Sequence, residues 1–169
     1  MMEGFQLRNM RDADIAAISL IQRQQYTDGF IEPDHVLRAR LAAFPQTAWV
    51  ATDVHGVCAY LVGYPSVVGH VTPLCGTFAS HQTPDTIYLH DLAVARRVAG
   101  AGVAGALVHL AWRTGIGMGI YRSSLVSVQD SQPFWHRHGY GALGLMDQMQ
   151  QTHLATYGSA ANYMVRTLG

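Results

Sequence analysis

The sequence predicts an α/β protein: a single domain over residues 1–169 that is built on a mixed sheet. The chain is 49% hydrophobic and 13% charged, which suits one compact domain with a substantial core. Several β-rich runs follow one another with turn residues between them. Apolar residues also recur at helical spacing in three separate places. Together these patterns indicate strands and helices mixed along one chain.

The first half of the chain is predicted to hold one strand, two helices and a hairpin. Asp12 or Asp14 can cap the first helix or lie in its first turn, and Phe44-Pro45 ends the second. In chain order the ranges are 5–8 for the strand, 15–21 for the first helix with 22–29 as its frayed end and loop, 32–44 for the second helix, and 48–52 and 57–63 for the hairpin.

The second half begins with residues 64–85, a long segment rich in Pro, Gly, Ser, Thr and His. A loop of this length is uncommon in a compact domain unless it is functional or mobile. We interpret its His70 and His81 as ordinary loop histidines. The ranges predicted after it are a strand at 87–94, a helix at 103–114, a strand at 120–129, a short helix at 132–138, and strands at 142–150 and 162–167.

Composition excludes several classes of partner. Lys and Arg number 11, and Asp and Glu also number 11, so the chain has no charge excess that would attract nucleic acid or an anionic membrane. No run of about 18 apolar residues is present for a membrane span, and the polar N-terminus has no signal core. We therefore expect a cytoplasmic protein. Cys58 and Cys75 are expected to be buried, reduced thiols.

The stretch from Ile87 to Ala104 combines an apolar strand, a glycine-rich loop and the start of a helix. This order creates a place to hold phosphate, because backbone N–H groups point outward there. Side chains alternate along a strand, so His90 and Asp91 lie on opposite faces. Both faces are mostly apolar, which indicates a central strand covered on both sides.

Residues Gly100 to Gly105 match the pattern GxGxxG, which alone is a weak indicator of dinucleotide binding. In a dinucleotide fold the glycines follow the strand directly, and an acidic residue ends the next strand. Here residues 95–99 intervene, and Leu125-Val126-Ser127 supplies no acid. A nicotinamide or flavin oxidoreductase is therefore kept as a less favoured alternative.

The same stretch resembles the coenzyme A signature of the GNAT superfamily of N-acetyltransferases. That signature has a strand ending like Leu92-Ala93-Val94, a five-residue connection, and an R/Q-x-x-G-x-G/A loop that opens a helix. The usual Arg or Gln position is Ala99 in this register, whereas Arg97 satisfies the pattern two residues earlier. Downstream, residues 130–140 resemble a second coenzyme-side motif through Phe134, Gly139 and Tyr140.

The resemblance implies a GNAT-like acyl-CoA N-acyltransferase fold, with a central mixed, mostly antiparallel sheet flanked by helices, and acetyl-CoA as cosubstrate. We expect no metal. The strand end would pair with the pantetheine arm, and the loop would bind pyrophosphate mostly through backbone N–H groups. Trp135 stands where many relatives have the Tyr that protonates the leaving thiolate, and we expect it to pack against the coenzyme. The cofactor-binding residues implied in this way are Leu92, Ala93, Val94, Ala99, Gly100, Ala101, Gly102, Val103, Ala104, Ser131 and Trp135.

The resemblance further implies transfer of acetyl to a primary amine by direct attack. An ammonium group with a pKa of about 10.4 is neutral in roughly one molecule in a thousand near pH 7.4, so a base is useful, and a histidine suits this task. In arylalkylamine N-acetyltransferase the strand reads H-x-H-x-L-A-V; here it reads Tyr88-x-His90-x-Leu92-Ala93-Val94. His90 is thus either the proton acceptor or a structural histidine. Tyr88 is the second catalytic candidate, and Asp91 is expected to have a structural partner.

Several questions stay open. The leaving thiolate can depart with help from water, from Tyr140 or from a nearby His. A non-catalytic coenzyme A-binding module with the same fold is the main alternative to an enzyme. His136-x-His138 lacks a third ligand for a metal. The acceptor is a small molecule or a peptide N-terminal or lysine amine, residues 64–85 are expected to shape its pocket, and the oligomeric state is open, a homodimer included.

Overall fold

A computed structural model describes residues 4–169. These residues form two compact units. Unit 1 contains residues 4–63 and 91–111, and unit 2 contains residues 64–90 and 112–169. Strands β3 (Gly56–Ser66) and β4 (Thr86–Val94) and helix α3 (Val103–Gly117) each contribute residues to both units. The prediction of a single domain remains a prediction.

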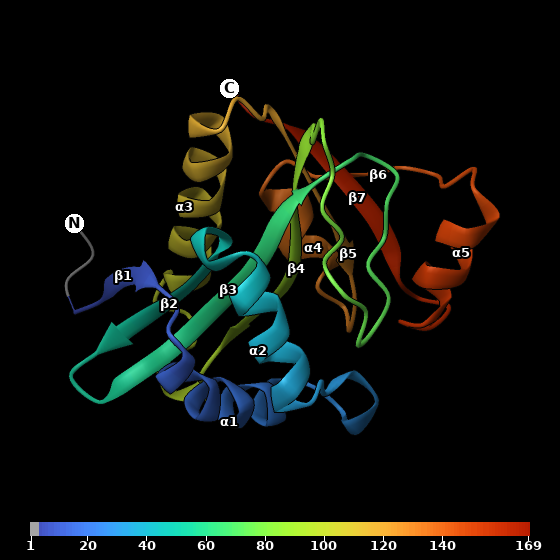
Figure 1. Cartoon of the computed structure of the whole chain (residues 1–169). Coiled ribbons are helices and arrows are strands. Elements are labelled where there is room, and N and C mark those ends of the chain that lie inside the picture. Colours follow the sequence, from blue (N-terminus) through green and yellow to red (C-terminus); the bar gives the residue numbers. More distant parts are fainter. Residues whose placement is uncertain (1–3) are drawn as a thin grey trace. The chain divides into compact units, whose positions relative to one another are not determined.

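The strands form a seven-stranded mixed sheet in the order β1-β2-β3-β4-β5-β7-β6 (Figure 1). Neighbours β1–β2, β2–β3, β5–β7 and β6–β7 are antiparallel. β4 and β5 are parallel, with Ile87, Tyr88 and Leu89 opposite Ser123, Ser124 and Leu125, and β4 continues beyond this register to Val94. The predicted mixed, mostly antiparallel sheet flanked by helices is confirmed.

Unit 1 holds two helices and the N-terminal strands. Helices α1 and α2 lie side by side in Figure 1. Most of their apolar positions are buried, as the helical spacing predicts: Ile15, Ile18 and Ile21 on α1, and Leu37 and Leu41 on α2, whereas Leu20 is exposed. The bounds are β1 (Gln6–Asn9), α1 (Ile15–Gln25), α2 (Asp34–Ala43) and β2 (Ala48–Asp53), with 3₁₀ turns at Asp12–Asp14, Asp28–Phe30, Pro45–Thr47 and Arg96–Val98.

A buried ion pair fixes the start of α2. Arg40 binds Glu32 through two hydrogen bonds of 2.6 and 2.7 Å, and both side chains are 2% exposed. Gln22 holds Glu32 in place, because its amide donates to the Glu32 carbonyl at 3.1 Å and accepts from the Glu32 N–H at 2.8 Å. This contact explains why α1 continues to Gln25, where the sequence suggested a frayed end.

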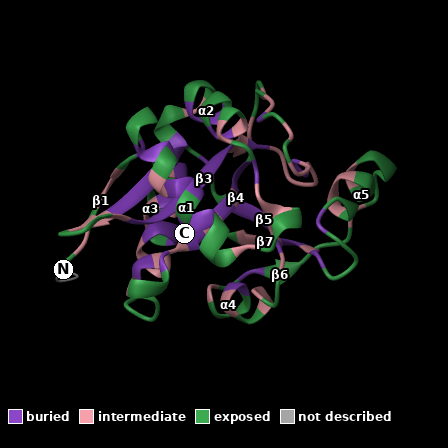
Figure 2. Cartoon of the chain, turned by 90° about the horizontal axis from the view of Figure 1, so that it is seen from below, coloured by how far each residue is buried: buried purple, intermediate pink, exposed green. Residues whose placement is uncertain are grey.

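Unit 2 contains the remaining elements: β5 (Arg122–Ser127), α4 (Gln132–Arg137), β6 (Gly141–Ala142), α5 (Gln148–Ala155) and β7 (Asn162–Thr167). β3 runs to Ser66, three residues into the segment expected to be loop. α3 continues past Thr114 to Gly117, and Gly119, with φ of +78°, follows its end. In Figure 2 buried residues follow β3 and β4, whereas α5 is largely exposed. Cys58 is buried as expected, but the expectation for Cys75 is wrong, because Cys75 is exposed.

The predicted strand at 142–150 is wrong. Two residues form β6, and residues 148–155 form α5. Leu143 and Met149 within this range are exposed, so the range does not form a strand with a buried apolar face. The helix begins because the Asp147 carboxylate accepts from the Gln150 N–H at 3.1 Å, which caps its first turn.

No helix within residues 4–169 is both long enough and apolar enough to cross a membrane.

Replacing Arg40 by Met should lower the free energy of unfolding by about 3–5 kcal/mol, because it leaves the Glu32 carboxylate buried without its cation. Arg38→Met is the matched control on the same helix. Arg38 pairs with Asp12 at 3.1 Å, but both side chains are well exposed, so its loss should cost less than about 1 kcal/mol. Urea unfolding measures both variants, and equal losses would contradict this assignment.

Candidate functional site

The end of β4, in unit 1, is held by two hydrogen bonds. The Ala95 N–H donates to the Cys58 carbonyl on β3, and the Tyr26 hydroxyl donates to the Leu92 carbonyl, each at 2.8 Å. Backbone groups of successive strand residues point to alternate sides, so Leu92 and Val94 present theirs to the edge away from β3. Tyr26 therefore lies at the strand edge that the resemblance assigns to the pantetheine arm.

The loop after β4 contains two glycines with positive φ and leads into the start of α3. Gly100 and Gly102 have φ of +78° and +82°, a region that residues with a side chain rarely adopt. Ala106 donates the first bond of α3, to the Gly102 carbonyl at 3.2 Å. The N–H groups of residues 103–105 precede that bond, and such groups at a helix start attract anions.

Arg96 and Arg97, which precede this loop, both bind partners within unit 1. Arg97 forms an ion pair with Asp53, whose carboxyl pKa is lowered chiefly by this hydrogen bond. Arg96 donates to the Gln24 carbonyl at 2.9 Å. Ala99 therefore remains the position that corresponds to the usual Arg or Gln of the signature, and a role of this loop in binding the coenzyme remains a prediction.

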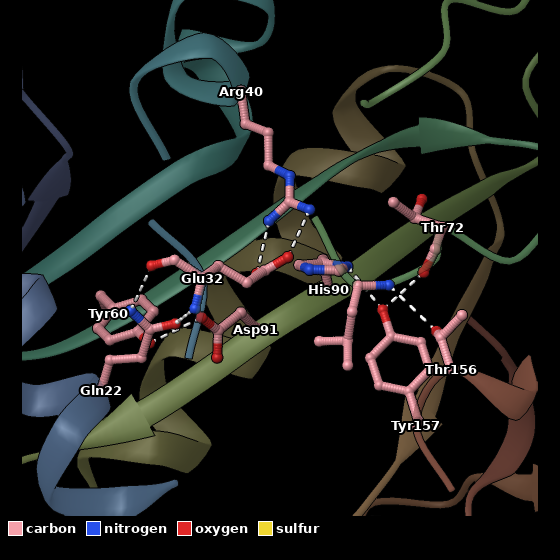
Figure 3. Close-up of polar contacts among 10 residues, drawn as sticks. Gln22, Glu32, Arg40, Tyr60, Thr72, His90, Asp91, Thr156 and Tyr157 are labelled. Atoms are coloured by element: carbon pink, nitrogen blue, oxygen red, sulfur yellow. Dashed lines mark hydrogen bonds and ion pairs between the residues drawn. The ribbon is translucent and has the colours of Figure 1, made fainter. Parts of the chain in front are cut away.

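Asp91 is buried in unit 1 and accepts a hydrogen bond from the Tyr60 hydroxyl at 2.7 Å (Figure 3). Burial, and then the negative charge of Asp91, raises the pKa of Tyr60 and of Tyr26 well above the ordinary value. Both tyrosines thus stay protonated as donors. The expectation of a structural partner for Asp91 agrees with this contact.

His90, in unit 2, lies among aromatic rings. Phe78 meets it edge-on, with ring centroids 5.4 Å apart, and Tyr88 lies at 6.3 Å. Tyr88 itself is 1% exposed and packs edge-on against Tyr64. The Tyr157 hydroxyl lies 3.5 Å from His90 Nδ1, as Figure 3 shows. Of the two catalytic candidates, His90 is thus the partly exposed side chain and Tyr88 is a core residue.

Residues 71–74 of the long loop are hydrogen-bonded to α5 and the residues after it. The Val71 N–H donates to Gln150 at 2.7 Å, and His153 Nδ1 bonds the Val71 carbonyl at 2.7 Å. The Leu74 N–H donates to Thr156 at 3.2 Å, and the Tyr157 hydroxyl donates to the Thr72 carbonyl at 2.6 Å. This part of the segment is therefore attached to a helix that the sequence did not predict.

The loop histidines are not isolated. The rings of His70 and His81 are 5.1 Å apart, and those of His70 and His153 are 6.5 Å apart. Within the part of the chain that the structure describes, no group of three or more His, Cys, Asp or Glu side chains is arranged to hold a metal ion. The three rings therefore form a histidine cluster rather than a ligand set.

The predicted coenzyme-side residues of the second motif are also in unit 2. The Ser131 hydroxyl accepts from the Val128 N–H at 3.1 Å. Trp135 is 7% exposed and packs edge-on against Tyr140 and Phe134. His136 and His138 bond backbone carbonyls through Nδ1. The contact of Trp135 with a coenzyme remains a prediction.

Tyr140 is poorly suited to protonate a leaving thiolate. Its hydroxyl donates to Ser123 at 2.7 Å and accepts from Trp112 at 2.9 Å. Burial raises its pKa to about 12. These contacts give Tyr140 a structural role.

Sequence reasoning missed two tyrosines that contact the predicted site residues. Tyr26 bonds the Leu92 carbonyl, and Tyr157 approaches His90. Each partner is more than 60 positions away along the chain, so no local pattern points to either contact.

Comparison with known proteins agrees with the family resemblance seen in the sequence. Residues 15–140 match the model of the acetyltransferase (GNAT) family. No curated protein sequence matches the chain.

Solved structures with this fold cover almost the whole chain at low identity. Ard1 from Thermoplasma volcanium is 15% identical, with a TM-score of 0.74 over 98% of this chain and 99% of that one. The GNAT-like decarboxylase GphF, in complex with isobutyryl-CoA, is 13% identical, with a TM-score of 0.77 over 97% and 100%. Rv2747 from Mycobacterium tuberculosis, in complex with CoA and NLQ, is 16% identical, with a TM-score of 0.69 over 97% and 99%.

Acidification should destabilise unit 2 through His70. Burial, and then His81 and His153, lowers the pKa of His70 below the ordinary 6.5. The unfolded chain thus binds this proton at higher pH than the folded chain, so the free energy of unfolding falls as the pH drops below about 6.5. Thermal unfolding at pH 8 and pH 5.5 should show a smaller loss in His70→Gln than in wild type. The exposed His55→Gln is the control, and equal losses in all three proteins would contradict the prediction.

Proposed function

Because the chain belongs to the GNAT acetyltransferase family, we propose that it transfers an acetyl group from acetyl-CoA to a primary amine by direct attack. Family membership makes it an acyltransferase, and the dinucleotide-binding alternative falls away. The acceptor class proposed is a small-molecule amine or a peptide N-terminal or lysine amine. The equal numbers of acidic and basic residues make a strongly basic peptide the less suitable acceptor.

The observation that carries this proposal is the order of β4, the glycine loop and α3. Gly100 and Gly102 take positive φ angles, and the N–H groups of residues 103–105 precede the first bond of the helix. A pyrophosphate needs donors of this kind without bulky side chains in front of them. Residues 99–104 are therefore proposed to hold acetyl-CoA, with Leu92, Ala93 and Val94 along its pantetheine arm.

His90 is proposed as the proton acceptor. An amine with a pKa of about 10.4 is largely charged near neutral pH, and the neutral form lies about 4 kcal/mol higher at pH 7.4. A histidine in its neutral form can remove the proton as the amine attacks the thioester carbonyl. The carbon–nitrogen bond forms, the carbon–sulfur bond breaks, and a backbone N–H near the end of β4 would stabilise the oxyanion between these events.

A thiol-release screen over amines, peptides and aminoglycosides tests the function and the role of His90 together. Wild type should release free thiol from acetyl-CoA in the presence of an accepted amine. His90→Gln should be about 10²–10⁴-fold slower near neutral pH. The difference in rate between His90→Gln and wild type should shrink toward pH 10, where much of the amine is already neutral and needs no base. The exposed His55→Gln should match wild type.

No thiol release with any amine would contradict the proposed function and favour a different acyl-group reaction. Release that is unchanged in His90→Gln would instead remove His90 from the mechanism while keeping the function.

Gly100→Ala should weaken acetyl-CoA binding. The strained backbone at φ of +78° would displace an N–H group from a charged ligand, which is worth about 1.5–3 kcal/mol, or about 10- to 100-fold in KM. Gly56→Ala is the matched control. Gly56 also has positive φ, +107°, and an added Cβ meets nothing within 4 Å at either position, but Gly56 is the first residue of β3, next to the β2–β3 turn.

The two variants should lose similar stability, measured by thermal unfolding. A similar rise in the acetyl-CoA KM in both would contradict the assignment of the loop.

A further inference from the structure

Tyr157 has a hydrogen-bond arrangement that constrains His90. Tyr157 follows α5, is 8% exposed, and its hydroxyl donates to the Thr72 carbonyl at 2.6 Å. The same oxygen lies 3.5 Å from His90 Nδ1, with ring centroids 6.4 Å apart at 63°. At this length the second contact is weak, as hydrogen bonds in sites without substrate commonly are.

The position of the hydrogen between Tyr157 and His90 follows from the number of donors. A tyrosine hydroxyl has one hydrogen, and a carbonyl oxygen can only accept. Because the Tyr157 hydroxyl hydrogen points to the Thr72 carbonyl, the Tyr157 oxygen can only accept a hydrogen bond from His90. A hydrogen bond between the two side chains therefore requires Nδ1 of His90 to donate, and a neutral His90 that makes it carries its proton on Nδ1 and its lone pair on Nε2.

Thr72 and Phe78, which contact Tyr157 and His90, are packed against further residues. Thr72 is fully buried, and its hydroxyl is 2.5 Å from the Tyr64 hydroxyl. Phe78 stacks on Tyr64, with centroids 4.2 Å apart, and presents its ring to His90. The aromatic rings thus fix the plane of the imidazole, and the Thr72–Tyr157 bond fixes the direction of the hydroxyl.

We propose that Tyr157 is a positioning residue that holds His90 in the Nδ1–H tautomer, with Nε2 as the atom that accepts the proton of the amine. This inference rests on the proposed role of His90. When Nε2 takes the proton, the imidazolium donates from Nδ1 to the Tyr157 oxygen, whose own hydrogen stays on Thr72. The aligned dipoles stabilise the new positive charge, and no proton leaves Tyr157.

Tyr157→Phe tests the proposal, because it removes the oxygen and keeps the ring. Long-range ¹H–¹⁵N NMR of histidine-labelled protein at pH 8 reports which ring nitrogen is protonated, and the His90→Gln spectrum assigns the His90 signals. Wild type should show a protonated Nδ1 and an unprotonated Nε2. In Tyr157→Phe the two tautomers should mix, and kcat should fall about 10-fold or more while the KM for acetyl-CoA stays within twofold. Tyr121→Phe, at an exposed tyrosine, is the matched control.

An Nε2–H tautomer in wild type would overturn the proposal, and this measurement needs no folded variant. An unchanged tautomer in Tyr157→Phe would also overturn it. A tautomer that depends on Tyr157, in a protein that acetylates no amine, would support the hydrogen-bond arrangement and contradict the proposed function instead.

Discussion

The carboxylate of Asp91, buried on the central strand, is the constraint on which unit 1 depends. Removing a charge from water is costly unless donors surround it, and here Tyr60 supplies one at 2.7 Å. The neighbouring Tyr26 is influenced by the same charge and bonds the Leu92 carbonyl. The end of β4 is therefore held by polar contacts as well as by the sheet. The strand that carries the proposed site has little freedom to shift its register.

Much of the fold was predictable because each element carries its own local signal. The β4–α3 stretch combines an apolar run, two glycines and a helical period, and all three appear in the structure. Helix α5 was not predictable from apolar spacing, because it buries none of its residues. Asp147 as an N-cap was its one local signal. The contacts of Tyr26 and Tyr157 depend on tertiary folding, so a sequence pattern could suggest His90 but not the group that orients it.

The two departures from the coenzyme A signature have different structural consequences. Ala99 removes a side chain from a loop whose remaining features are backbone features, so the cradle keeps the groups that would bind pyrophosphate. Trp135 replaces a residue type that can release a proton, and its indole is packed among rings. Tyr140, the nearby alternative, is engaged on both sides of its hydroxyl. A thiol of ordinary pKa, about 8.5, leaves readily enough near neutral pH for water to serve.

In the proposed arrangement, the orientation of His90 depends on residues 71–74 and Tyr157, which are joined to α5 and the residue after it, and α5 buries none of its residues. Elements with few buried apolar groups open locally well before the whole protein unfolds. Because α5 is joined to the loop by side-chain hydrogen bonds, opening of either segment would release Tyr157 from Thr72. If Tyr157 orients His90 as proposed, the fraction of molecules with a correctly oriented imidazole follows this local opening equilibrium. A surface substitution on α5 could thus change turnover without altering any group that touches a substrate.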